Sequence, residues 1–129
     1  MKKIILTFAA AFVLVGCQSK ITGTLEVDGA PFAARQCRSG EAFGFYGIEL
    51  TDTANRRLRI YPNADGTCAV ALFKGDAATG DAIKRCGSLT MEKQSSRINS
   101  IHNVRGTAQL ACEAGSHKIA GNVEFENCH

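Results

Sequence analysis

The stretch that decides the fold is IELTDTANRRLRI, residues 48–60. Apolar and polar residues alternate on both sides of a short polar loop, which is typical of two antiparallel strands with one buried face. Two cross-strand pairs fit this pattern: Leu50 with Leu58 and Ile48 with Ile60. The three residues 53–55 then form the loop, in which Asn55 can adopt the left-handed conformation that such a loop requires. We therefore expect a hairpin of residues 43–51 and 57–61, with Glu49 opposite Arg59 on its outer face.

The same alternation continues outward from this hairpin, and turn signals recur along the chain. Strands are expected at residues 21–27, 67–73 and 87–94, with a second hairpin of residues 104–112 and 118–126. Residues 30–40 are expected to be an irregular edge, residues 81–85 a short helical turn, and residues 95–103 a polar segment anchored by Ile98 and Ile101. The sequence thus predicts an all-β fold, a small antiparallel β-sandwich or open barrel of about seven to nine short strands, stabilised by disulfides.

The first residues have a different character. Lys2 and Lys3 precede an apolar run, residues 4–15, and the run ends in Leu14-Val15-Gly16-Cys17. A positive start, an apolar middle and small residues before a cysteine are typical of a secretory signal, and the run is shorter than the roughly 20 residues that a membrane span needs. This pattern resembles the lipobox of bacterial lipoproteins.

The resemblance implies cleavage between Gly16 and Cys17 and a diacylglyceryl group on the Cys17 sulfur. Residues 1–16 are then a signal peptide, residues 17–20 a lipidated tether and residues 21–129 a single β-domain. In the enterobacterial members of this family, an aspartate after the cysteine retains the protein in the inner membrane, so the resemblance implies that Gln18 favours the outer membrane. We expect a lipid-anchored protein of the bacterial envelope. A plain secreted protein is the alternative, but it would leave an odd thiol at Cys17.

Five cysteines remain once Cys17 carries lipid, and the expected compartment is oxidising, so disulfides are expected. The number is odd, which leaves one thiol unpaired. No two cysteines have the close spacing of a zinc or redox motif, so we expect no metal site. Strand parity places Cys68 on the inner face with Val70 and Leu72, which predicts that Cys68 is the free, buried thiol.

The second hairpin then selects among the pairings of the other four cysteines. Cys112 lies beside the hairpin turn and Cys128 at the far end of the return strand, which is about eight residues at about 3.3 Å each. A disulfide needs Cα atoms within about 7 Å, so these two cannot pair. If residues 87–94 pair with residues 104–110, Cys86 lies beside Cys112. We therefore predict Cys86–Cys112 and Cys37–Cys128.

Composition excludes several classes of function. The formal charge of +3 includes Lys2 and Lys3 of the signal, so the mature chain lacks the basic face that nucleic-acid binding requires. The chain contains no nucleophile-elbow or P-loop motif, and no cofactor is expected. His117 lies in a turn and is expected to be solvated, as are the arginines around Arg57.

We therefore expect a non-enzymatic structural or binding module. Its partners would be the membrane, through the lipid, and an envelope protein or an apolar ligand. The alternative is a carrier that holds a small apolar ligand within the β-fold.

Overall fold

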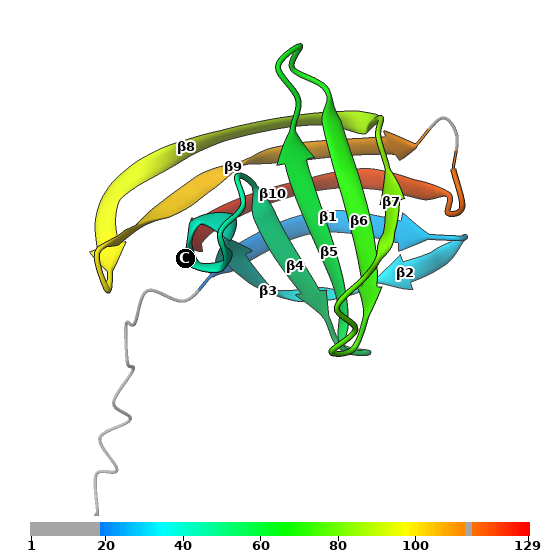
Figure 1. The fold of residues 1–129 in the computed structure, drawn as a ribbon, viewed down its shortest axis with the longest axis horizontal. Coiled ribbons are helices and arrows are strands. Elements are labelled where there is room, and N and C mark those ends of the chain that lie inside the picture. The colour runs from blue at the N-terminus through cyan, green and yellow to red at the C-terminus, as the bar shows by residue number, and fades with distance from the viewer. Residues whose placement is uncertain (1–18, 113–114) are drawn as a thin grey trace, which may run out of the picture.

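The computed structural model describes residues 19–112 and 115–129, which form two five-stranded antiparallel sheets (Figure 1). In spatial order, sheet A contains β2 (Ala30–Phe32), β1 (Lys20–Val27), β10 (Ile119–Cys128), β9 (Ile101–Cys112) and β8 (Cys86–Ile98). Sheet B contains β3 (Ala34–Ser39), β4 (Ile48–Asp52), β5 (Arg56–Pro62), β6 (Cys68–Lys74) and β7 (Asp81–Ile83). The strands of one sheet cross those of the other, as in orthogonally packed sandwiches.

The predicted fold class is confirmed, and the fold is a sandwich, not a closed barrel. The residues that the structure describes form ten strands, more than the seven to nine expected. The short strands β2 and β7 lie at sheet edges, and their three residues each are too few to give a periodic signal. The expected irregular edge at residues 30–40 is instead the two edge strands β2 and β3, with a register shift between Ala34 and Gln36.

The prediction of a helical turn at residues 81–85 is wrong. Asp81–Ile83 is strand β7, and it pairs with β6 through Val70 and Ile83. The physical reason is burial, because this pairing places the Ile83 side chain in the core, where it is only 4% exposed. A single apolar residue among polar neighbours carries no period, so the tertiary contact decides its conformation.

The hairpin of β4 and β5 has the predicted register. Leu50 lies opposite Leu58 and Ile48 opposite Ile60, and Asn55 has a φ of 64°. All four apolar side chains are fully buried. However, β4 begins at Ile48 and not at residue 43, because residues Gly40–Phe43 form a 3₁₀ turn, η1, which ends at Gly44 with a φ of 80°. The residues that follow η1 belong to the candidate site described below.

The core lies between the sheets as one continuous cluster of buried apolar side chains. Sheet B contributes the fully buried residues of β4 and β5, together with Val70 and Leu72 of β6. Sheet A contributes inward-facing residues of β1, β9 and β10, among them Leu25, Ala108 and Phe125. Each set follows the two-residue period of its strand, which is why the core could be expected from the sequence pattern.

The cysteines form the two pairs that the strand pattern suggested. Cys37–Cys128 joins β3 of sheet B to β10 of sheet A, and Cys86–Cys112 joins β8 to β9. Cys68 is unpaired and fully buried, and its Sγ–H donates to the carbonyl oxygen of Cys86 at 3.3 Å. Burial raises the pKa of the Cys68 thiol to about 11, so it stays protonated at neutral pH.

Chemical denaturation, which measures the free energy of unfolding, can distinguish the unpaired Cys68 from the disulfide-bonded cysteines. Replacing Cys68 by Ala or Val should cost about 1 kcal/mol or less, because it changes only a small core volume. The matched control removes Cys37 and Cys128 together, whose separation is 91 residues, and should cost about 4.6 kcal/mol by loop-closure entropy. A loss of about 2–5 kcal/mol for the Cys68 variants would contradict the unpaired assignment.

Candidate functional site

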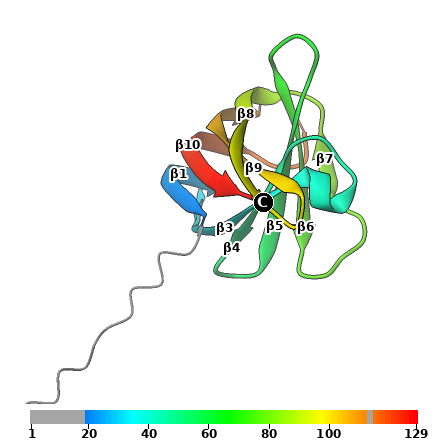
Figure 2. The same ribbon diagram turned by 90° about the vertical axis from the view of Figure 1, so that its left-hand side faces the viewer.

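At one end of the sandwich, two extended features face each other (Figures 1 and 2). The first is the loop from η1 to the start of β4. The second, here called the arm, is the far part of the β8–β9 hairpin, residues 91–104. It reaches beyond sheet B, and its tip is the turn between Ile98 and Ile101. Strand β1 begins and strand β10 finishes on this same side of the molecule, which faces the viewer in Figure 2.

The arm was not predicted, since residues 95–103 read as a polar segment. Its turn is the pair Asn99 and Ser100, whose φ values are 51° and 67°. Two successive residues with positive φ are typical of the tightest hairpin turns. Asn99-Ser100 between Ile98 and Ile101 was therefore a hairpin signal in the sequence. It was obscured because β8 contains a register shift between Lys93 and Arg97, which breaks the alternation.

The loop is built on glycines and one ring. The Ser39 side chain caps η1 by accepting from the Glu41 amide, and the Gly40 amide donates to the carbonyl of Gly47. A Cβ on Gly40 would lie 2.5 Å from the Phe45 ring, so only glycine allows the ring to pack there. This packing places the Phe45 ring against Arg59 and Tyr61 of β5 and leaves its neighbours on the loop exposed.

Those neighbours are Phe43 and Tyr46. Their exposed fractions are 46% and 67%, and they are the large apolar side chains that remain exposed among residues 19–112 and 115–129. The Arg38 guanidinium lies over the Phe43 ring, 5.7 Å from its centroid. Two exposed rings on one short loop make this loop a candidate interaction surface.

A groove of about 400 Å³ separates the loop from the arm. On the loop side it is lined by Ser39, Glu41, Gly44, Phe45, Tyr46 and Gly47, and on the arm side by Met91, Glu92, Lys93 and Val104. Apolar walls with a few charged groups are usual for binding grooves. The groove and the two exposed rings form the candidate site, here called the open end.

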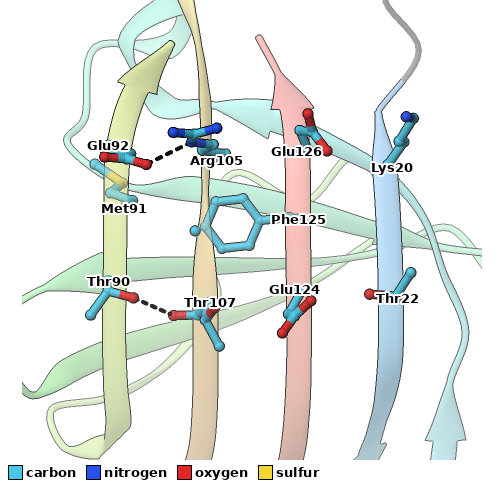
Figure 3. Close-up of a pocket in the computed structure, with 11 residues that line it drawn as sticks. Lys20, Thr22, Thr90, Met91, Glu92, Arg105, Thr107, Glu124, Phe125 and Glu126 are labelled. Carbon is cyan, nitrogen blue, oxygen red and sulfur yellow. Dashed lines mark hydrogen bonds and ion pairs between the residues drawn. The ribbon is translucent and has the colours of Figure 1, made fainter.

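A larger depression, about 590 Å³, lies on the outer face of sheet A (Figure 3). Figure 3 shows one row of side chains across four strands: Lys20, Glu126, Arg105 and Glu92. Lys20 lies opposite Glu126 in the register, and Arg105 donates to Glu92 at 2.6 Å. The charges alternate along the row and neutralise one another, so this face offers less to a partner than the open end.

The arginines of β5 are not the solvated residues that we expected. Arg59 donates to Glu49 at 2.9 Å, and Arg57 lies 3.5 Å from the same carboxylate. Both guanidinium groups stack over the Phe73 ring, and Arg59 also lies 4.5 Å from the centroid of Phe45. The rings of Phe73 and Phe45 shield these side chains from solvent. Both arginine side chains are therefore only 22% exposed, and Glu49 is buried on the outer face of the sheet. This layer supports the loop from behind, through Phe45.

His117 is also not a solvated turn residue. Its Nδ1 lies 2.7 Å from Asp28 and its Nε2 2.7 Å from Asp81, and the side chain is only 17% exposed. We call this cluster the His117 clamp. Asp28 belongs to the β1–β2 turn of sheet A and Asp81 to β7 of sheet B, so the clamp joins the sheets at the end opposite the open one.

The two hydrogen bonds, first to Asp28 and then to Asp81, raise the pKa of His117. The His117 hydrogen bond also lowers the pKa of Asp28, with help from the Lys118 amide. A protonated imidazole donates from both nitrogens, so the charged form suits this geometry. Neither nitrogen is free to bind a metal.

Cys17 and residues 1–16, the predicted signal peptide, lie outside the described residues. The Nδ1 atom of His102 lies 2.8 Å from the carbonyl oxygen of Gln94. In the described part of the chain, no three His, Cys, Asp or Glu side chains are grouped to hold a metal ion. In that same part, no helix has the length and apolar character needed to cross a membrane.

No family model matches this chain, and no curated protein or solved structure is significantly similar to it. The site must therefore be understood from its own geometry.

The His117 clamp predicts a pH-dependent stability. Because the pKa of His117 is raised in the folded state, its contribution is complete below the unfolded pKa of about 6.5 and is lost as pH rises through the folded pKa. The lowered pKa of Asp28 acts on the acid side, where its contribution is lost as pH falls through the folded pKa. His117→Gln should therefore lower the free energy of unfolding more at pH 6 than at pH 9. Equal losses at both values would contradict the clamp.

Proposed function

We propose that this chain is a lipoprotein of the bacterial envelope, anchored through Cys17, and that its β-sandwich is a non-enzymatic binding module. The outer membrane is the favoured location, because Gln18 and not an aspartate follows the cysteine. The observation that carries the binding role is the open end, where Tyr46 lines an apolar groove and Phe43 is exposed on the same loop. No nucleic acid is among the proposed partners.

The environment of the reactive side chains supports a non-enzymatic role. The Cys68 thiol is fully buried and its pKa is raised to about 11, whereas a nucleophilic cysteine needs a lowered pKa and access to substrate. His117 has both nitrogens bound by carboxylates, so it is not available as a general base. The proposal therefore does not include a catalytic step or a cofactor.

The packing of the core favours a binding surface over a carrier of an apolar ligand. An enclosed ligand would need space between the sheets, where the buried side chains of both sheets form one continuous cluster. The groove at the open end has the volume of a small-molecule site, but Tyr46 on its wall is 67% exposed. A ligand there would stay in contact with solvent, which suits a docking surface better than a carrier.

The anchor is tested by Cys17→Ser in the full chain, expressed in a host that processes lipoproteins. Only a thiol accepts the diacylglyceryl group, so the variant should be unprocessed or soluble, whereas the wild-type chain fractionates with membranes. A Cys17→Ser protein that is cleaved and still fractionates with membranes would show that the anchor is elsewhere.

The binding surface is tested by light-induced cross-linking in intact cells. A photoreactive benzoylphenylalanine in place of Tyr46 should give adducts, with lipid or with protein, in several-fold higher yield than the same group in place of Ala64. Ala64 is the matched control, since it is also exposed but lies in the β5–β6 turn, away from the open end. Equal yields at the two positions would exclude the open end as the binding surface.

A further inference from the structure

The distance between the lipid and the domain is set by very few residues. Ser19 is held in place, because its Oγ donates to the carbonyl oxygen of Cys37 at 2.8 Å. Only Gln18 separates Ser19 from Cys17, so two residue steps span at most about 7 Å. If Cys17 carries lipid, as proposed above, Ser19 must therefore lie close to the bilayer surface.

Ser19 lies at the open end of the sandwich. Its partner Cys37 is bonded to Cys128 at the end of β10, and Cys37 is only two residues from Ser39, which caps η1. Figures 1 and 2 show the start of β1, the η1 loop and the tip of the arm on the same side of the molecule. The lipid therefore brings this whole end, and not the His117 end, toward the membrane.

The side chains at this end suit an interface between water and lipid. Phe43 and Tyr46 are exposed on the loop, and Ile98 and Ile101 are partly exposed at the tip of the arm. Tyrosine concentrates at the headgroup level of membranes, and phenylalanine is common on apolar faces that rest at this interface. Arg38 over Phe43, and Lys93 and Arg97 on the arm, can keep their charges in the headgroups while their stems contact apolar groups.

Acidic groups are present at this end as well. Glu41 is exposed on the loop, Glu126 lies opposite Lys20, and Glu92 is paired with Arg105. The charges are therefore mixed, and electrostatic attraction to anionic lipid is not the main contribution. The apolar side chains, held near the surface by a short tether, have a high effective concentration there, so a weak contact is enough.

We propose that the η1 loop and the tip of the arm form a membrane-contact face, on which the domain rests against the bilayer that holds its own lipid. This proposal rests on the lipid anchor at Cys17. The short tether favours lipid over a protein partner, because it holds the loop and the tip of the arm beside the bilayer, where lipid is the nearest surface. The contact would fix the orientation of the domain and turn the groove toward the lipid.

The chain contains no tryptophan, so a single introduced tryptophan reports on its own position. The test uses the full chain carrying Tyr46→Trp, processed in a host, purified with its lipid and reconstituted into phosphatidylcholine vesicles that contain brominated lipid. The matched control is Ala30→Trp. Ala30 is exposed on β2 and lies opposite the last residue of β1, which is about 23 Å from the first residue of this eight-residue strand. Phe43→Trp is a second reporter in case Tyr46→Trp disturbs the loop.

Bromine should quench Tyr46→Trp and Phe43→Trp several-fold more strongly than Ala30→Trp, with little change when phosphatidylglycerol replaces part of the phosphatidylcholine. Equal quenching at both ends, with the diacylglyceryl group on Cys17 verified by mass spectrometry, would overturn the membrane-contact face and leave the anchor intact. Absence of the diacylglyceryl group from Cys17 would overturn the anchor, and the contact face with it. Quenching confined to vesicles that contain phosphatidylglycerol would overturn the apolar contact described here.

Discussion

The Cys37–Cys128 disulfide is the constraint on which the rest of the structure depends. It joins the edge strand β3 of sheet B to the end of β10 in sheet A, so the two sheets cannot separate at that end. It also fixes Cys37, whose carbonyl holds Ser19, and Ser39 two residues later, which caps η1. One covalent bond thus sets the position of the chain's entry into the domain and of the loop that carries Phe43 and Tyr46.

At the opposite end, a charged cluster links side chains of the two sheets, which the main chain also connects there between β7 and β8. His117 bridges Asp28 of sheet A and Asp81 of sheet B, so the sandwich has a disulfide at one end and a pH-dependent side-chain link at the other. Between the two ends, buried side chains of both sheets form one continuous core. The groove lies outside this core, between the η1 loop and the arm. The molecule is therefore asymmetric, and its apolar surface is at the end where the chain enters.

Features governed by a local period could be predicted from the sequence. The register of β4 and β5, the inward position of Cys68 and the opposition of Cys86 and Cys112 all follow from the two-residue alternation of a strand. Side-chain contacts between distant segments could not, apart from the Cys37–Cys128 pair, which followed by elimination. The His117 clamp joins residues 89 and 36 positions apart, and the stacking of Arg59 on Phe45 and Phe73 requires the folded sheet. The arm was missed because a register shift hides its alternation, although its Asn99-Ser100 turn was visible.

The central claim is that the open end of the sandwich faces the bilayer. Hydrogen–deuterium exchange tests it most directly, by comparing the lipidated protein in nanodiscs with the same chain carrying Cys17→Ser, isolated without lipid. Amides of residues 40–47 and 97–102 should exchange more slowly in the nanodiscs, whereas those of residues 63–66 in the β5–β6 turn should not change. Identical exchange of residues 40–47 in the two forms would contradict the claim.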